Sequence, residues 1–192
     1  MKCPKCDSTM KKIVGDHLYR ESGMDHVILR NITQYVCEED GSSFVQIPAI
    51  AQLHRTLALA IAEKRARMIP SEVRFLRDHL EVSNTQFAEL MGVTPTQSSR
   101  WTTSETIGLQ AERLLRLLVA FGPERVKAAT EATLFVSSAT TQKARAQVAE
   151  ETLGDVANVI HRLLSSSPEA RAVEIGLRRS GTRWKQDAAL TN

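Results

Sequence analysis

The chain has 192 residues, a formal net charge of +3 and 42% hydrophobic residues, with an aromatic content of 5%. This length suits two small domains better than one, and so mild a net charge does not by itself indicate a nucleic-acid ligand. No apolar segment follows Met1, and the longest aliphatic run, LALAIA, is far too short to cross a bilayer. We therefore expect a cytoplasmic protein with no membrane contact.

The first expected module, residues 1–47, is strand-like. The runs MKKIVGDHLYR and HVILRNITQYV are rich in β-branched and aromatic residues, and a turn segment containing Gly23 separates them. Three cysteines are an odd number, which fits a disulfide framework poorly and leaves thiols available for metal in a reducing compartment. This pattern predicts a β-hairpin flanked by cysteine-bearing turns.

The cysteines predict a zinc ribbon. MKCPKC places Cys3 and Cys6 at a spacing that lets two thiolates bind one tetrahedral ion from a single turn. After the second strand-like run, CEEDG places Cys37 and Asp40 at the same spacing, with Gly41 able to turn the chain. We expect these four side chains to hold a structural zinc ion, which would supply much of the stability of so small a module.

Two alternatives to this four-ligand zinc site remain open. His17 or His26 could fold over the site from the hairpin and replace Asp40, since imidazole is a more frequent structural ligand than carboxylate. The site could also be free of metal, with Asp40 accepting a hydrogen bond in a tight turn and the cysteines buried as small hydrophobic residues.

Helical patterns follow the ribbon. Pro48 can open a helix, and apolar residues at helical spacing continue to Met68, which predicts a linker helix over residues 48–69. Residues 70–122 read as several short helices with Ser83 as an N-cap, Pro95 as a helix start and Gly122 as a stop. Residues 123–192 contain helix-compatible pieces and a frayed tail.

The expected fold class is therefore multidomain and mainly α. It comprises a small N-terminal β zinc ribbon (1–47), a linker helix (48–69), an all-α helix-turn-helix domain (70–122) and a helical C-terminal extension (123–192).

The segment NTQFAELMGVTPTQSSRW has the spacing of a helix-turn-helix with its recognition helix second. Between Glu89 and Glu105 there is no acidic residue, so this window can meet phosphates and base edges. Arg100 has a fork suited to guanine and Gln97 can pair with adenine, whereas Asn84 is placed for a phosphate contact. The expected DNA-binding residues are Asn84, Thr94, Thr96, Gln97, Ser99 and Arg100. The alternative is an ordinary helical hairpin whose Ser and Thr side chains are only solvated.

The order of these modules resembles the MqsA family of antitoxins, also called YgiT-type zinc-finger proteins. The resemblance rests on MKCPKC, the hairpin, the second knuckle and SSRW, and covers roughly residues 1–122. It implies that the ribbon engages a partner, often an RNA-cleaving toxin, and that the second domain dimerises on a palindromic operator. By the same resemblance Thr96 and Arg100 read bases, and Asp40 stands where the family carries a fourth cysteine.

These patterns predict a DNA-binding repressor of the antitoxin type that binds its double-stranded operator as a homodimer. The alternative is a protein-interaction adaptor, in which the ribbon and the tail are the working surfaces and DNA binding is vestigial. We do not expect an enzyme, because no open metal position with a neighbouring acid or base is apparent.

Overall fold

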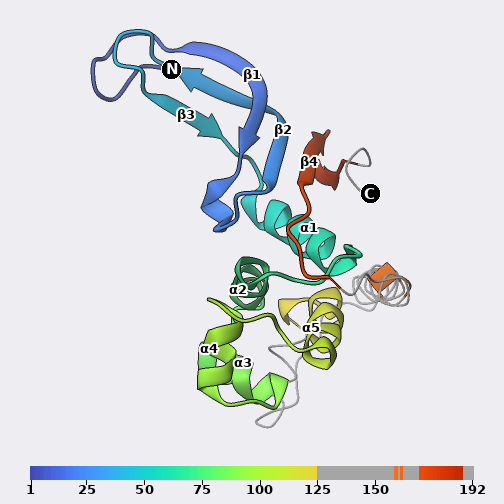
Figure 1. Cartoon of the computed structure of the whole chain (residues 1–192). Helices are drawn as coiled ribbons and strands as arrows, with labels where there is room; N and C mark the ends of the chain where they lie inside the picture. The colour runs from blue at the N-terminus through green and yellow to red at the C-terminus, as the bar shows by residue number, and fades with distance from the viewer. Residues whose placement is uncertain (125–157, 160, 162–168, 188–192) are drawn as a thin grey trace, which may run out of the picture. The chain divides into compact units, whose positions relative to one another are not determined.

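The computed structural model describes residues 1–124, 158, 159, 161 and 169–187 (Figure 1). The chain divides into two compact units. Unit 1 comprises residues 1–57 together with those from Glu174 onward, and unit 2 comprises Ala58–Val173. Among the described residues, no helix has the length and apolar content that crossing a membrane requires.

Unit 1 is built on one five-stranded sheet. Its strands are β1 (Lys11–Leu18), β2 (Val27–Val36), β3 (Ser43–Gln46), β4 (Ile175–Ser180) and β5 (Arg183–Gln186). The order is β1-β2-β4-β5, and β3 also pairs with β2. All pairings are antiparallel except that of β2 with β4, which is parallel. A short 3-10 helix, Arg20–Ser22, lies between β1 and β2.

Strand β2 is the centre of the sheet because it serves three neighbours. One edge pairs with β1, whereas the other pairs with β4 over Val27–Arg30 and with β3 over Thr33–Val36. The change of partner coincides with Asn31, whose φ is 55°, and with a register shift between Gly15 and His17. Such a bulge bends both strands. The bend separates the outer end of the ribbon, where β3 pairs with β2, from the end of the sheet that carries the larger core.

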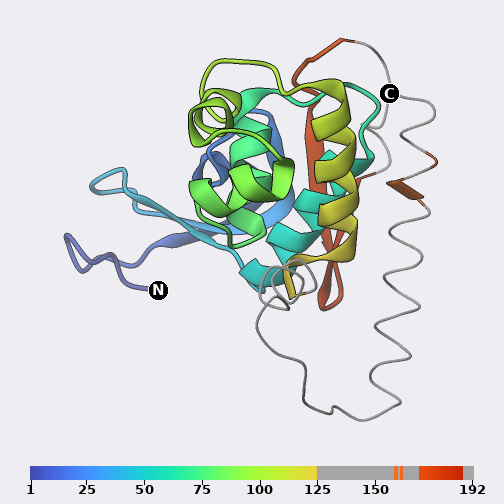
Figure 2. The same ribbon diagram turned by 90° about the horizontal axis from the view of Figure 1, so that it is seen from below.

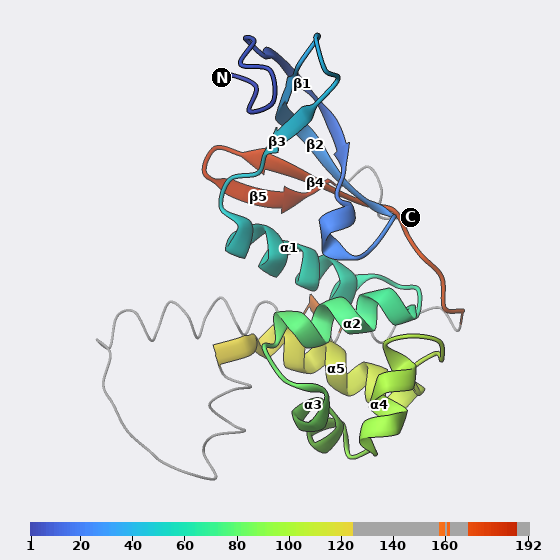
Figure 3. The same ribbon diagram turned by 90° about the vertical axis from the view of Figure 1, so that its left-hand side faces the viewer.

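The larger core of unit 1 lies between this sheet and the first half of helix α1 (Ile50–Glu63). Val27 and Leu29 of β2 and Leu53 of α1 have no exposed surface. Trp184 of β5 is 4% exposed, and its indole N–H donates to the carbonyl of Pro48 at 2.9 Å. Figure 3 shows the β4–β5 hairpin beside α1.

These strands correct the expected fold class. The protein is not mainly α with a small N-terminal ribbon, because the sheet has five strands and two of them, β4 and β5, come from the C-terminal region expected to be helical. Ile175 and Leu177 alternate with exposed or small residues, and both are buried beside β2. The pairing with β2 and the turn at Gly181, whose φ is 61°, override the helix-compatible composition.

The tail expected to fray from Ser180 instead forms β5 as far as Gln186. The other helical pieces expected after Pro123 lie largely outside the described residues. The linker helix expected over 48–69 begins at Ile50 and ends at Glu63.

Unit 2 contains the short helices that the sequence predicts: α2 (Pro70–His79), α3 (Asn84–Met91), α4 (Pro95–Trp101) and α5 (Leu109–Phe121), shown in green to yellow in Figure 2. The hydroxyl of Ser83 accepts from the backbone N–H of Gln86 and caps α3, and Thr94 caps α4 in the same way. Gly92 ends α3 at a φ of 66°, a left-handed conformation that glycine adopts without strain. Phe87, Leu76 and Leu115 are fully buried among these helices.

A buried arginine joins these helices to the chain that leads into them. Arg116 of α5 is 1% exposed. Its guanidinium donates to the carbonyls of Ala62, Lys64 and Ala66 at 2.7–2.8 Å and to the Glu112 carboxylate at 2.6 Å. The carbonyls at the end of α1 have no partner within their own helix, so Arg116 satisfies them from outside.

The same buried cluster holds further ion pairs. Glu112 also accepts from Nε of Arg67 at 3.0 Å and from the backbone N–H of Met68. The ammonium group of Lys64 contacts both oxygens of Glu72, which is fully buried, at 2.6 and 2.7 Å. Burial lowers the pKa of Lys64, while the neighbouring Glu72 carboxylate opposes that shift.

Removing the Arg116 guanidinium should therefore lower the stability of unit 2 more than most substitutions do. In Arg116→Met, three buried carbonyls lose their donor and the buried Glu112 carboxylate loses one of its two cationic partners, so we expect a loss of about 3–5 kcal/mol. Urea unfolding followed by circular dichroism measures this loss. Arg113→Met, an exposed position on the same helix, is the control and should change stability by less than about 0.5 kcal/mol. Equal stability of the two variants would contradict the role given to Arg116.

Candidate metal centre and nucleic-acid interface

Four side chains converge at the outer end of the ribbon in unit 1. The candidate ligand atoms of Cys3, Cys6, Cys37 and Asp40 all lie within 4.8 Å of one another. Cys3 and Cys37 are buried, whereas Cys6 and Asp40 are exposed. This is the complete ligand set that the sequence predicts, drawn from two segments more than thirty residues apart.

The two segments have the same backbone geometry. In the first, the N–H of Asp7 donates to the carbonyl of Cys3 at 3.0 Å, and in the second the N–H of Gly41 donates to the carbonyl of Cys37 at 3.1 Å. Asp7 and Gly41 both have positive φ, 58° and 70°. Asp40 therefore occupies in the second turn the place that Cys6 occupies in the first.

A second pair of hydrogen bonds closes each turn. The N–H of Cys3 donates to the carbonyl of Ser8 at 2.9 Å, and the N–H of Cys37 donates to the carbonyl of Ser42 at 2.8 Å. These bonds orient each pair of side chains toward the other pair, so the backbone itself prepares the cluster.

The donor atoms fit a tetrahedral zinc ion. Zinc–sulfur bonds of about 2.3 Å place two ligated sulfurs about 3.8 Å apart, and a sulfur and an oxygen slightly closer. The sulfurs of Cys6 and Cys37 are 3.4 Å apart, and the sulfur of Cys3 is 3.3 Å from Oδ2 of Asp40. Small outward movements of these side chains would accommodate the ion.

Asp40 is prepared as an anionic ligand. The backbone N–H of Ser42 donates to its Oδ1 at 2.8 Å, and this bond, together with those from the cysteine thiols, holds the pKa of the Asp40 carboxyl well below its usual range. Oδ2 faces Cys3 and is the oxygen directed at the other donors. A hydrogen bond to the non-ligating oxygen is the arrangement that orients carboxylates in metal sites.

Ser8 is a member of the site that sequence reasoning missed. Its hydroxyl lies 2.9 Å from the sulfur of Cys6 and 3.2 Å from that of Cys37. Hydrogen bonding by Ser8 is the main cause that lowers the pKa of the Cys6 thiol, which favours the thiolate that binds metal. Its position two residues after the cysteine pair was the only available signal.

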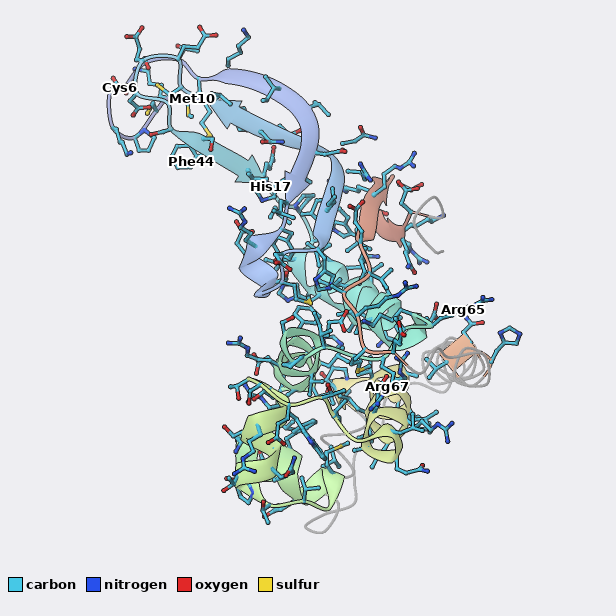
Figure 4. All side chains as sticks on the ribbon, in the orientation of Figure 1. Cys6, Met10, His17, Phe44, Arg65 and Arg67 are labelled. Carbon is cyan, nitrogen blue, oxygen red and sulfur yellow. The ribbon has the colours of Figure 1, made fainter. Side chains whose placement is uncertain are left out.

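Neither histidine belongs to the cluster. His17 is paired with Leu29 near the inner end of β1 and contacts Glu21 at 3.6 Å, while His26 contacts Asp25 at 3.4 Å. Figure 4 shows Cys6, Met10 and Phe44 at the outer end of the ribbon and His17 farther along it. Among the described residues, the group that could hold an ion contains Asp40 and no histidine.

The apolar packing around the cluster is thin. Among the residues that the structure describes, Met10 is the one further buried hydrophobic residue packed with Cys3 and Cys37, and Tyr35 and Phe44 cover them partly. So small a set buries little apolar surface, so a bound ion would contribute a large part of the stability of this end of the ribbon.

In unit 2, helices α3 and α4 form the expected pair joined at Gly92. Asn84 connects them: its amide N–H donates to the carbonyl of Pro95 at 3.0 Å, and its Oδ1 accepts from the hydroxyl of Ser98 at 2.7 Å. Ser98 is fully buried at a position that usually carries an aliphatic side chain. The hydrogen bond to Asn84 satisfies its hydroxyl, which explains how a polar residue is accommodated there.

The outer face of α4 carries the other expected DNA contacts. Thr94, Thr96, Ser99 and Arg100 are exposed, and Gln97 is half-buried. The hydroxyl of Thr94 is used as the cap of α4 and accepts from the N–H of Gln97 at 3.2 Å. The remaining side chains face solvent on one short helix.

Glu105 is an acidic neighbour of this face that sequence reasoning had placed only as the end of the acid-free window. Its carboxylate accepts from Nε2 of Gln97 at 3.0 Å and lies 3.6 Å from a guanidinium nitrogen of Arg100. One exposed carboxylate thus contacts both Gln97 and Arg100, the two side chains that the sequence analysis assigned to base contacts.

The two sites differ in what their geometry provides. The ribbon offers one compact donor set for an ion, and α4 offers a polar, acid-free helix face whose Gln97 and Arg100 are held by Glu105.

No protein-family model, curated protein or solved structure matches this chain.

Proposed function

We propose that this protein is a sequence-specific DNA-binding repressor of the antitoxin type, which binds a palindromic operator as a homodimer. The observation that carries the proposal is the pair α3–α4, joined at a left-handed Gly92 and presenting Thr96, Ser99 and Arg100 on the exposed face of the second helix. In a helix-turn-helix the second helix enters the major groove and its exposed side chains contact base edges.

The side chains on this face match what DNA recognition requires. Arg100 can make a bidentate contact to guanine, Gln97 can pair with adenine, and the hydroxyls of Thr96 and Ser99 can bond to bases or phosphates. Pairing with Glu105 orients Gln97 and Arg100 in the free protein. On DNA, nearby phosphates would repel the Glu105 carboxylate. Gln97 and Arg100 would then exchange their contacts with Glu105 for contacts with the bases.

The ribbon supports the proposal as a metal-stabilised module. Zinc fits the three thiolates and one carboxylate at Cys3, Cys6, Cys37 and Asp40, with all protein ligands occupying the tetrahedron and therefore a structural role. By its place in the proposed antitoxin, this module is the surface that engages a toxin protein. An ion held without an open position also agrees with a protein that is not an enzyme.

Helix α5 supports assembly as a dimer. Leu114 and Phe121 are 39% and 42% exposed, and Leu117 and Leu118 between them are half-buried. These residues follow the i, i+3, i+4, i+7 spacing of one helix face. An apolar stripe of this kind on an exposed helix fits a second copy of the same stripe across a two-fold axis.

The first prediction tests base reading. Arg100→Ala should weaken operator binding by about 1–3 kcal/mol per half-site and relax the preference at one base pair, because a bidentate guanine contact is lost. Glu105→Gln should act in the opposite direction, since it removes the negative charge that competes for Arg100 and repels phosphate. Binding to fragments selected from genomic DNA, measured by fluorescence anisotropy, gives both quantities.

Asn84→Ala is the control for this experiment. It should weaken binding on all sequences alike, as a phosphate contact carries no sequence information. It should also lower the free energy of unfolding by about 1 kcal/mol, because Ser98 and Pro95 lose their partners. If Arg100→Ala leaves affinity and sequence preference intact, the assignment of α4 as the recognition helix is wrong.

A second prediction concerns the metal. Purified protein should contain about one zinc per chain, and Asp40→Cys should retain it more tightly against a chelator, because thiolate suits zinc better than carboxylate. The double variant Cys3→Ser, Cys6→Ser should lose the ion. His17→Ala is the matched control and should keep its zinc; loss of zinc in that variant, or retention in the double variant, would refute the site. Elemental analysis after dialysis measures the content.

The third prediction concerns assembly. Half-sites of a helix-turn-helix dimer lie about 34 Å apart, so the protein should sediment as a dimer at micromolar concentration. Leu114→Glu with Phe121→Glu should give a monomer, because two carboxylates would be buried without partners. Ile50→Glu replaces an apolar residue that is 52% exposed on α1 and serves as the control. A dimer that survives the double substitution would place the interface elsewhere.

A further inference from the structure

The β4–β5 hairpin of unit 1 carries a dense group of exposed cations. Arg178, Arg179, Arg183 and Lys185 are all exposed, and no acidic residue occurs between Ile175 and Gln186. The two flanking carboxylates have other partners: Asp187 contacts Arg178 at 3.0 and 3.1 Å, and Glu174 lies 3.4 Å from a guanidinium nitrogen of Arg30. In the part of the chain that the structure describes, Arg179, Arg183 and Lys185 have no ion-pair partner.

The strand register places like charges together. Arg178 is the cross-strand partner of Lys185, and Ser180 is the partner of Arg183. Directly opposite residues share a face of the sheet, so Arg178, Lys185 and Arg183 lie on the same side of the hairpin. Like charges directly opposite one another destabilise a sheet. A polyanion bound along this face would relieve that repulsion.

The hairpin is held in place by the rest of unit 1. The backbone N–H of Trp184 donates to Oε1 of Gln52 at 3.3 Å, and its indole N–H donates to Pro48. The N–H of Asp187 donates to the carbonyl of Gly176 at 2.7 Å. The charged side chains are therefore presented by an ordered hairpin with a two-residue turn. This order lowers the conformational entropy that the hairpin loses when a ligand binds.

We propose that the β4–β5 hairpin binds the phosphate backbone of double-stranded DNA. The proposal rests on the function proposed above in taking DNA as the ligand, but it concerns a separate element and a sequence-independent contact. Arginine and lysine on an exposed ribbon neutralise phosphates without reading bases, so the hairpin adds affinity to every sequence alike. The specificity of binding remains with the recognition helix.

The test measures the salt dependence of binding to a random-sequence DNA duplex by the full chain. Each phosphate contact contributes about 0.9 to the slope of log affinity against log salt, so Arg183→Gln with Lys185→Gln should lower the slope by about 1.8. Lys12→Gln with Arg20→Gln removes two exposed charges elsewhere in unit 1 and should leave the slope unchanged. Equal slopes for the hairpin variant and the wild type would overturn the proposal.

A smaller change keeps the test decisive if the double variant is unstable. Arg183→Gln alone should lower the slope by about 0.9, and thermal unfolding followed by circular dichroism shows whether each variant is folded. Vesicles rich in phosphatidylserine supply a second anionic surface. A hairpin variant that loses binding to these vesicles while binding the duplex normally would assign the hairpin to membranes and overturn the DNA proposal.

The outcome separates this proposal from that of the recognition helix. The hairpin variant should keep its preference among DNA sequences, whereas Arg100→Ala should relax that preference at one base pair. A slope that depends on the hairpin in a protein without any sequence preference would leave the hairpin proposal standing and refute the repressor. Intact sequence preference with an unchanged slope would do the reverse.

Discussion

The guanidinium of Arg116 determines the path of the chain through unit 2. It is enclosed by carbonyls of Ala62, Lys64 and Ala66 and by the carboxylate of Glu112, so its charge is solvated by the protein. Glu112 in turn accepts from the N–H of Met68, which fixes the chain just before α2 begins. Helices α2 and α5 are thereby set against the same turn, and α4 contacts α2 while α3 contacts α5. The placement of α4 thus depends on a buried charge that makes no contact with the exposed face of that helix.

The parts of the fold that the sequence predicted are those with local signals. Ser83, Gly92 and Pro95 act within a few residues of themselves, so the boundaries of α3 and α4 could be read directly. The two turns that carry the candidate metal ligands were predicted just as directly, because the spacing of Cys3 and Cys6 recurs in Cys37 and Asp40. That spacing also explains why Asp40, rather than a histidine of the hairpin, lies with the three cysteines.

What the sequence did not reveal depends on residues far apart in the chain. The segment that forms β4 has a composition compatible with a helix, and its pairing with β2 and β5 makes it a strand. Arg116 looks like an ordinary charge on an amphipathic helix, since nothing local shows that its partners belong to the segment after α1. The same holds for Glu105, whose contacts with Gln97 and Arg100 arise only when the chain after α4 folds back.

The parallel pairing of β2 with β4 has a consequence for how the chain folds during synthesis. The paired residues Val27 and Ile175 are about 150 positions apart, which is a contact of very high order and slow to form. Until the ribosome has released that distant strand, the free edge of β2 and the surfaces of Leu29 and Leu53 lack their cover. Unit 2, which is continuous in sequence, can fold first. Unit 1 then closes last, and its nascent β2 is the segment for which a chaperone would be most useful.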